Sequence, residues 1–403
     1  MNGLKKITVY TLVASLTVYF IAVGAQAKGP KKNHTKNIIF IVPDGMGLAD
    51  VTAARIFKYG PDGDRLSFEL LPVIGYQSTH SANSTVTDSA AAASAWASGD
   101  KYNNGEISCH DNNLDGACDD VPVQTILDIA QKKGKAAGLV TTSDITHATP
   151  AAFGSNVHNR KCEEEIALQY LARGIEVLLG GGIAANRSSC MLMHSDSKGV
   201  WFDDMLDRYE DADYTIVYTE DDMNAAVKAK AKKLLGLFKM GGKTPEIFRV
   251  DPTVVYPDGE PTLPEMTKAA LGILEKNKRG FFLMVECAQI DWANHGQDFE
   301  GQLAETLALD ETVDVILDWV YAKKKRQKET LIVVVPDHET AGFAISGPNN
   351  TLAEQGQLIE DAWAGSGHTA VDVLIWAQGP NSSKFGQALD NTDLYYLMKE
   401  AMK

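Results

Sequence analysis

The chain has 403 residues, enough for one large domain or two ordinary ones, and 44% of them are hydrophobic, enough for a sizeable core. A charged fraction of 23% argues against general disorder. The formal net charge of −15 does not favour nucleic acid recognition, and a site for an anionic substrate must carry its own local positive charge.

The first 27 residues have the pattern of a secretory signal peptide. Lys5 and Lys6 precede the apolar run Ile7–Val23, and an Ala-Gln-Ala motif ends at Ala27. A membrane anchor is the alternative, but the run is short for a span and contains several hydroxyl side chains. We therefore expect removal of residues 1–27. Residues 28–403 would then form one periplasmic or secreted domain without a membrane segment.

Along the mature chain, apolar runs rich in β-branched residues alternate with helical patterns. The expected strands are Asn37–Val42, Val73–Thr79, Ala136–Thr141, Ile175–Leu179, Leu234–Phe238, Phe281–Val285, Leu331–Val335 and Val371–Ala377. The expected helices are Ser89–Trp96, Val123–Lys132, Cys162–Ala172, Leu263–Lys276, Gly301–Ala322 and Thr392–Met402. This alternation predicts an α/β fold with a central, mostly parallel sheet flanked by helices on both faces. We expect Asn186–Pro264 to decorate that sheet, and the basic run Lys323–Lys328 to be a solvated helix end.

Ser89 begins the alanine-rich helix Ser89–Trp96. Unpaired backbone N–H groups and the positive end of the helix dipole point outward there, an arrangement that suits phosphate. The hydroxyl could attack phosphorus once it is deprotonated. The alternative is that Ser89 only caps the helix, since serine is an ordinary N-cap residue.

Acidic and imidazole groups follow three of the expected strands directly. Asp44 follows the first of them, Glu286 ends Phe281–Val285, and Asp337 and His338 follow Leu331–Val335. Ligands of open α/β sheets bind outside the carboxyl ends of the strands, so these side chains are expected to converge on a metal site.

Two further candidates for metal ligation lie between and after these strands. Asp291 and His295 are four residues apart, so they share one face of a helical turn and could bind one ion; a surface pair is the alternative. His368 is flanked by Gly367 and lies just before the strand Val371–Ala377.

Together these stretches resemble the bacterial alkaline phosphatases, in the order found in that family and over nearly all of the mature chain. The matching stretches are Pro43-Asp44-Gly45-Met46-Gly47, Thr87-Asp88-Ser89-Ala90-Ala91, Thr146-His147-Ala148-Thr149-Pro150, His158-Asn159-Arg160, Glu286, Gln289-Ile290-Asp291-Trp292, His295, Asp337-His338-Glu339-Thr340 and Gly367-His368-Thr369.

The resemblance implies two zinc ions and one magnesium ion. Asp291, His295 and His368 would hold the first zinc, and Asp44, Asp337 and His338 the second. Nitrogen and oxygen ligation suits zinc. Asp44, Thr149 and Glu286 would supply the oxygen ligands of magnesium. His147 stands where some members of the family have Asp and others His, so the identity of the third ion stays open.

The resemblance also implies hydrolysis of phosphate monoesters through a phosphoserine on Ser89. Arg160 would hold phosphate oxygens with its guanidinium fork. Trp292 stands where some relatives have Lys and others His, which predicts altered phosphate affinity; the alternative is a packing residue. The short interval Glu339–Gly367 implies a small crown-type insertion with an open cleft. A homodimer is expected from the family.

Two pairs of the five cysteines would close short loops, Cys109–Cys118 and Cys162–Cys190. Cys287 would remain a buried thiol. Residues 111–116 match the start of a calcium-binding loop, but Pro122 stands where a carboxylate ligand is needed. A disulfide-closed polar surface loop is therefore preferred over a calcium site.

The same residues favour phosphomonoester hydrolysis over three other activities. A sulfatase would need Pro and Arg where Ala91 and Ala93 stand. A phosphodiesterase is a relative with a similar metal site, but Arg160 suits a substrate with free phosphate oxygens. A non-catalytic phosphate or metal scavenger is disfavoured because Ser89, Arg160 and every expected ligand are retained.

Overall fold

The computed structural model describes residues 35–113, 115–119, 123–182, 202–250, 259–348 and 350–403. The expected signal peptide lies outside these ranges, so its removal stays a prediction. None of the described helices is both long and apolar enough to cross a bilayer.

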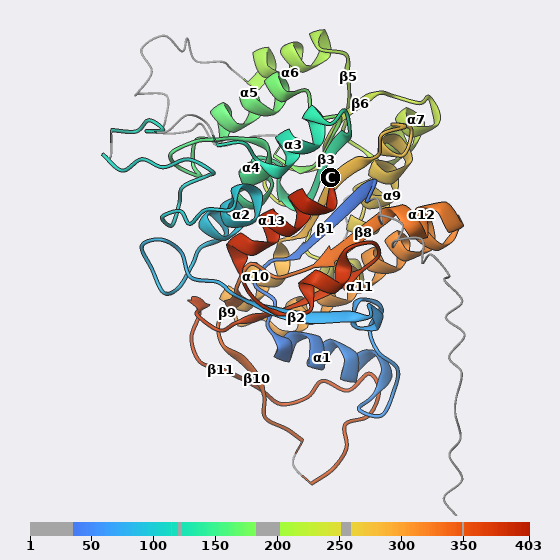
Figure 1. The fold of residues 1–403 in the computed structure, drawn as a ribbon. Helices are drawn as coiled ribbons and strands as arrows, with labels where there is room; N and C mark the ends of the chain where they lie inside the picture. Colours follow the sequence, from blue (N-terminus) through green and yellow to red (C-terminus); the bar gives the residue numbers. More distant parts are fainter. Residues whose placement is uncertain (1–34, 114, 120–122, 183–201, 251–258, 349) are drawn as a thin grey trace, which may run out of the picture. The chain divides into compact units, whose positions relative to one another are not determined.

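Strands and helices alternate along the described chain (Figure 1). The strands are β1 (Asn37–Pro43), β2 (Val73–Ser78), β3 (Ala136–Asp144), β4 (Val177–Gly181), β5 (Tyr214–Val217), β6 (Lys233–Leu237), β7 (Phe281–Cys287), β8 (Thr330–Val334), β9 (Glu339–Thr340), β10 (Phe343–Ile345), β11 (Asp361–Trp363), β12 (His368–Thr369), β13 (Val373–Gln378) and β14 (Ala388–Asp390). The α-helices are α1 (Leu48–Tyr59), α2 (Ser89–Ser98), α3 (Ile126–Lys132), α4 (Ala148–Gly154), α5 (Glu163–Arg173), α6 (Phe202–Asp211), α7 (Glu220–Lys228), α8 (Ile247–Val250), α9 (Leu263–Leu274), α10 (Gln289–His295), α11 (Phe299–Tyr321), α12 (Lys324–Glu329) and α13 (Asn391–Ala401).

Within the described ranges, the main sheet has ten strands in the order β14-β2-β13-β8-β1-β7-β3-β4-β6-β5. Only β13 runs antiparallel to its two neighbours, β8 and β2, among the described pairings of this sheet. The carboxyl ends of β1, β3, β7 and β8 therefore meet at one edge. The expected mostly parallel α/β sheet is confirmed.

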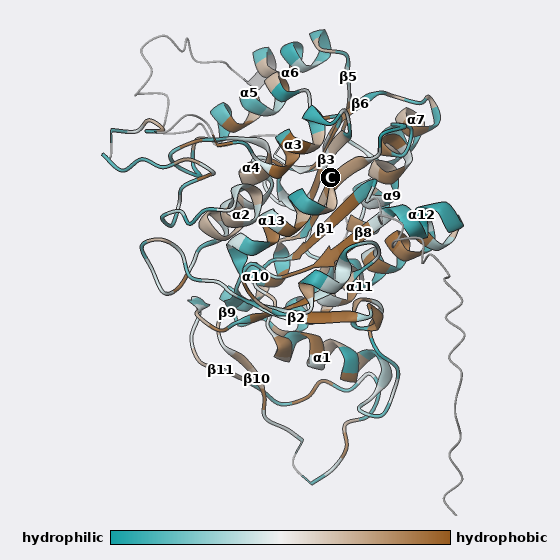
Figure 2. Cartoon of the chain, in the orientation of Figure 1, coloured by the Kyte–Doolittle hydropathy of each residue, from teal (hydrophilic) through white to brown (hydrophobic). Residues whose placement is uncertain are grey.

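Helices cover both faces of the sheet and form a hydrophobic core on each face. Successive side chains of a strand point to opposite faces and so pack in different cores. Phe40 of β1 packs in the core that also contains Trp96 of α2 and Phe153 of α4. Its neighbour Ile41 packs in the opposite core with residues of α9 and α11. Brown, hydrophobic strands lie between these helices in Figure 2. Burial of each large apolar side chain contributes about 1.5–3 kcal/mol, so this alternation fixes which face each helix covers.

Helix α2 is buried along its whole length, which explains its run of small residues. It packs against α4 and α13, where larger side chains would not fit. The N-cap is Asp88, whose side chain accepts a hydrogen bond from Ala91 N at 2.9 Å, so the alternative reading of Ser89 as the cap is wrong. Ser89 is instead the first helical residue.

Two expectations on irregular segments need correction. The segment Asn186–Pro264 does not merely decorate the sheet, because it supplies β5 and β6. Both strands are short and flanked by charged residues, and the sequence pattern indicated only β6. Residues 183–201 and 251–258 lie outside the described ranges. The run Lys323–Lys328 is not the end of the preceding helix, since most of it forms the separate short helix α12.

The expected small insertion is present between His338 and His368. It contains the two-stranded sheet β10–β11, and β9 pairs with β12 at its base. The disulfide Cys109–Cys118 is formed, and Cys287 is a buried free thiol, as expected. Cys190 lies outside the described residues, so its pairing stays a prediction.

Candidate active site

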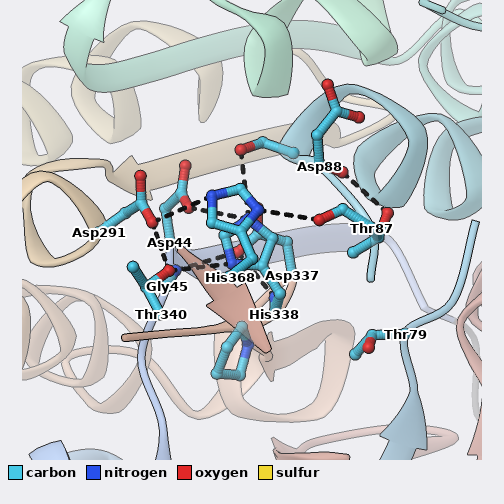
Figure 3. A network of polar contacts seen from close by, with 12 residues as sticks. Asp44, Gly45, Thr79, Thr87, Asp88, Asp291, Asp337, His338, Thr340 and His368 are labelled. Carbon is cyan, nitrogen blue, oxygen red and sulfur yellow. Dashed lines mark hydrogen bonds and ion pairs between the residues drawn. The ribbon is translucent and has the colours of Figure 1, made fainter. Parts of the chain in front are cut away.

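The neighbouring strands β1 and β8 bring one candidate metal cluster together at the carboxyl edge of the sheet. Asp44 directly follows β1, and Asp337 and His338 follow β8. The Nε2 atom of His338 lies 3.1 Å from Asp337 Oδ2 and 3.7 Å from Asp44 Oδ1. All three side chains are buried, and their ligand atoms lie within 4.8 Å of one another. Figure 3 shows these residues converging from separate elements.

A second cluster adjoins the first and contains Asp291, His295 and His368. The Nε2 atoms of the two histidines are 3.1 Å apart, and each lies within 3.5 Å of a carboxylate oxygen of Asp291. Asp291 and His295 occupy one face of α10, as their spacing predicts. His368 reaches the cluster because β12 pairs with β9, and its ring stacks on His338 at 3.6 Å between ring centroids.

Gly45 allows the turn after β1 to approach α10 closely. Its φ is +75°, and a Cβ atom there would lie 2.6 Å from Asp291 Cα. A larger residue would therefore separate the two clusters, which explains why glycine follows Asp44.

A third set of oxygen atoms lies near Asp44. Glu286 is the penultimate residue of β7, beside β1, and accepts hydrogen bonds from Thr141 and Ser143 of β3. The second carboxylate oxygen of Glu286, Oε1, has no hydrogen-bond partner among the described residues, and neither has Thr149 Oγ1 of α4. Both oxygens of Asp44 also lack one.

These buried, unpartnered oxygens test whether the site fits metal ions. A buried polar atom without a partner costs about 1–3 kcal/mol, and more when the group is charged. Burial raises the pKa of Asp44 well above its usual value, and the carboxylates of Asp337, Asp291 and Glu286 raise it further. Burial also raises the pKa of Glu286 to about 7. Divalent cations would satisfy the oxygens and offset the repulsion, so this donor set fits metal binding.

Ser89 lies beside the first cluster at the N-terminus of α2. Its Oγ is 3.4 Å from Nε2 of His338. The hydroxyl therefore faces a candidate metal ligand, and the free N–H groups of the ten-residue helix α2 point toward the same region.

Arg160 reaches this region from the loop between α4 and α5. Its Nη1 donates to Asp88 Oδ2 at 2.9 Å, and its Nη2 lies 3.0 Å from His147 Nε2. Burial, and next the charge of Arg160, lower the pKa of His147 to about 3, so this imidazole is neutral and can accept the hydrogen bond. The guanidinium is thus held between the residues that precede α2 and α4.

Several partners of these side chains were not anticipated from the sequence. The Nδ1 atom of His368 lies 2.8 Å from the carbonyl oxygen of Thr87, and Nδ1 of His295 lies 2.6 Å from that of Ser366. Thr340 donates to Asp291. Such contacts fix which ring nitrogen of each histidine faces the cluster. Thr87 and Thr340 belong to stretches that the sequence had singled out, but nothing in their local pattern indicated these partners.

A doubly covered, mostly parallel sheet with adjacent carboxylate–histidine clusters and a serine at a helix N-terminus defines a metal-dependent hydrolase site. The sequence profile of the family Alkaline phosphatase matches residues 35–362. The chain belongs to this family of phosphoric monoester hydrolases. It is 31% identical to alkaline phosphatase 3 of Bacillus subtilis, over 97% of this chain and 95% of the relative. It is also 31% identical to the alkaline phosphatase of Escherichia coli K12, over 91% of this chain and 86% of that relative.

Solved structures of the family share the fold. Alkaline phosphatase from the Antarctic bacterium TAB5 matches with a TM-score of 0.75 and 28% identity, covering 92% of this chain and 99% of that one. The Thermus thermophilus enzyme matches with a TM-score of 0.77 and 27% identity, covering 96% of each chain. The chain is therefore a metal-dependent alkaline phosphatase that hydrolyses phosphate monoesters.

Proposed function

We propose that Ser89 is the nucleophile, and that a phosphoserine forms on it and is then hydrolysed. The observation that carries this proposal is the position of Ser89 Oγ at the N-terminus of α2, 3.4 Å from His338 within the candidate metal cluster. An attacking oxygen there meets phosphorus beside helix N–H groups that can bind the phosphate oxygens. Transfer to Ser89 releases the alcohol, and water then releases inorganic phosphate and restores the hydroxyl.

We propose that Asp291, His295 and His368 hold one zinc ion, and that Asp44, Asp337 and His338 hold a second. Bound zinc would lower the pKa of the Ser89 hydroxyl and of water, and would offset charge on the departing oxygen. The protein's part is to present neutral nitrogen and carboxylate oxygen at fixed positions. His338 lies close enough to both carboxylates, Asp337 and Asp291, to couple the two clusters.

We propose that magnesium occupies the third set, Asp44, Thr149 and Glu286. A variant of the TAB5 enzyme has Mg bound in its M3 site, which supports a third ion in a relative that matches with 26% identity and a TM-score of 0.74. His147 bears on this assignment, since its Nε2 faces Arg160 and its Nδ1 has no hydrogen-bond partner among the described residues. A nitrogen donor there would favour zinc over magnesium.

Arg160 is proposed to bind the phosphate. Its two nitrogens are already aligned by Asp88 and His147, so little side-chain entropy is lost when it takes phosphate oxygens. With divalent cations bound, the site is locally positive and attracts a phosphate dianion despite the acidic chain.

The N-terminal pattern supports removal of residues 1–27 and a periplasmic or secreted mature domain, residues 28–403. Family membership supports a homodimer. The Cys109–Cys118 disulfide is consistent with an oxidising compartment.

Hydrolysis of p-nitrophenyl phosphate before and after chelation tests the metal proposal. Activity should vanish with the chelator and return with zinc and magnesium together. Zinc alone would restore full activity if the third site also takes zinc. Undiminished activity in the thoroughly chelated protein would contradict the proposal.

A further inference from the structure

The edge of the main sheet opposite the candidate active site is basic, although the chain as a whole is acidic. Strands β1, β3, β6, β7 and β8 all begin at this edge. We define the basic edge as the cations that immediately precede these strands or end the helices leading to them. Those not buried are Lys36, Lys132, Lys133, Lys228, Lys230, Lys232, Lys276, Lys278, Arg279, Lys323, Lys324, Lys325, Arg326 and Lys328.

Contacts link parts of the basic edge, one set of them through the buried Lys135. Lys135 Nζ donates to the carbonyl oxygens of Lys36 at 2.6 Å and Arg279 at 3.0 Å. Farther along the edge, Lys230, Lys232 and Lys276 line one cavity of about 230 Å³. In Figure 1, α7, α9 and α12 lie on the side of the sheet away from α10 and β9, and α12 is strongly hydrophilic in Figure 2.

Few acids offset this charge. Glu275 pairs with Lys323 at 3.7 Å and with Arg326, and Glu329 lies 3.9 Å from Lys36. Glu176 lines the same cavity as the three lysines. The basic edge ends where acids return: Asp211 and Asp213 precede β5, and Asp62 and Asp64 precede β2.

The basic edge has the chemistry of a docking surface for phosphate headgroups. Its cations come from several elements along one sheet edge rather than from one groove, which suits a planar partner more than a single polymer chain. Most are exposed lysines, which attract anions as mobile point charges. Of the large apolar side chains exposed in the described ranges, Tyr321 is the one next to α12. A row of stacking platforms for nucleic acid bases is therefore missing from this described surface.

We propose that the basic edge docks the protein peripherally on a bilayer containing anionic phospholipids, with the candidate active site facing away. The seven-residue strand β1 separates the two by roughly 20 Å. Electrostatic screening acts over about 8 Å at physiological salt, so the local basic charge is felt more strongly than the net charge of the chain.

Vesicle cosedimentation of residues 28–403, loaded with zinc and magnesium, tests the proposal. The shortened chain removes any contribution from the apolar run 7–23. We expect binding to vesicles of equal parts phosphatidylglycerol and phosphatidylcholine, loss of binding on pure phosphatidylcholine, and weakening with salt. The double variant Lys324→Glu/Lys325→Glu should bind at least tenfold more weakly, since each basic residue near an anionic bilayer contributes roughly a factor of five.

The matched control is Arg208→Glu/Lys268→Glu, which makes the same change in net charge at exposed positions on α6 and α9 that do not belong to the basic edge. This control should retain most of the vesicle binding. Equal losses in both variants would show a net-charge effect and overturn the proposal. Binding to soluble heparin without binding to the anionic vesicles would also overturn it, in favour of a polymer.

Orientation is tested by activity on the vesicles. If the candidate active site faces away, vesicle-bound protein should hydrolyse p-nitrophenyl phosphate with the same kcat/KM as free protein. Occlusion of this soluble substrate on binding would contradict the proposed orientation. Vesicle binding itself does not depend on Ser89, so Ser89→Ala should bind normally, whatever its activity.

Discussion

Asn294 and Asp50 are hydrogen-bonded beneath the candidate active site, with 3.3 Å between Asn294 Nδ2 and Asp50 Oδ1. The same nitrogen lies 3.3 Å from the carbonyl oxygen of Gly45, and Asp50 Oδ2 accepts from Gly47 N at 2.6 Å. Asn294 stands on α10 between two candidate zinc ligands. This buried network therefore ties α10 to the turn that carries Asp44.

Asn294→Ala should weaken metal binding without touching a ligand. It removes one donor from Asp50 Oδ1, which keeps Gln302 Nε2, and one from the carbonyl oxygen of Gly45, which keeps Thr340 N. The loss of this link between α10 and the turn after β1 loosens the two clusters relative to each other. Zinc titration of the chelated protein should require roughly tenfold more zinc for half-maximal activity. Asn224→Ala, at an exposed position on α7, is the control and should leave the titration unchanged. A normal zinc requirement in Asn294→Ala would contradict this role.

Asp88 has two contacts that substitutions can separate. It caps α2 through Ala91 N and pairs with Arg160. Asp88→Asn keeps a cap but removes the charge beside the guanidinium, so phosphate inhibition should change with little loss of stability. Asp88→Ala should change inhibition similarly and also lower the free energy of unfolding by about 1 kcal/mol. Inhibition constants and urea unfolding of both variants test this, and equal loss of stability in the two would argue against the cap.

Arg160→Ala should raise KM for p-nitrophenyl phosphate and weaken phosphate inhibition by about tenfold to a hundredfold, since charge-assisted hydrogen bonds contribute about 1.5–3 kcal/mol. Arg160→Lys should recover only part of this, because an ammonium group cannot bind two oxygens in parallel. Steady-state kinetics and product inhibition measure both effects. Unaltered phosphate inhibition in Arg160→Ala would remove Arg160 from the binding site.

Trp292 is held at the rim of the site by two neighbours. Its ring lies edge-on to His147 at 6.1 Å between centroids, and a Cβ atom on Gly242 would come within 2.5 Å of it. The indole can donate one hydrogen bond but carries no charge. Trp292→His should therefore alter phosphate inhibition. Unchanged inhibition together with lower thermal stability would assign Trp292 a packing role instead.

Glu305 gives a pH prediction away from the ligands. Burial raises its pKa to about 8, while the unfolded chain has an ordinary value near 4.3. Between these values the folded protein holds a proton that the unfolded chain has lost, so stability falls as pH rises from about 5 to 8. Glu305→Gln lacks this dependence, and its stability relative to the parent should grow by a few kcal/mol over that window. A pH-independent difference in urea unfolding would contradict the assignment.

Much of the site was predictable because its residues follow regular elements. Asp44, Glu286 and Asp337 come directly after apolar strands, and parallel strands bring such positions to one edge. Asp291 and His295 follow from helical spacing. The contact of Arg160 with His147 and Asp88 was not predictable, since it depends on loops whose closure no local pattern encodes. His368 was a candidate ligand, but its contact with His338 was not predictable either, since it depends on the pairing of two short strands. Strand β5 was missed because its four residues carry too little periodicity.

The most direct test of the account is the activity of Ser89→Ala, purified with its metal content verified. The account predicts a loss of p-nitrophenyl phosphate turnover by several orders of magnitude, with unchanged thermal stability and metal content. Ser98→Ala, at the other end of α2, is the control for the helix and should remain active. If Ser89→Ala retained the turnover of the parent protein, Ser89 could not be the group that accepts the phosphoryl moiety, and the proposed mechanism would be wrong.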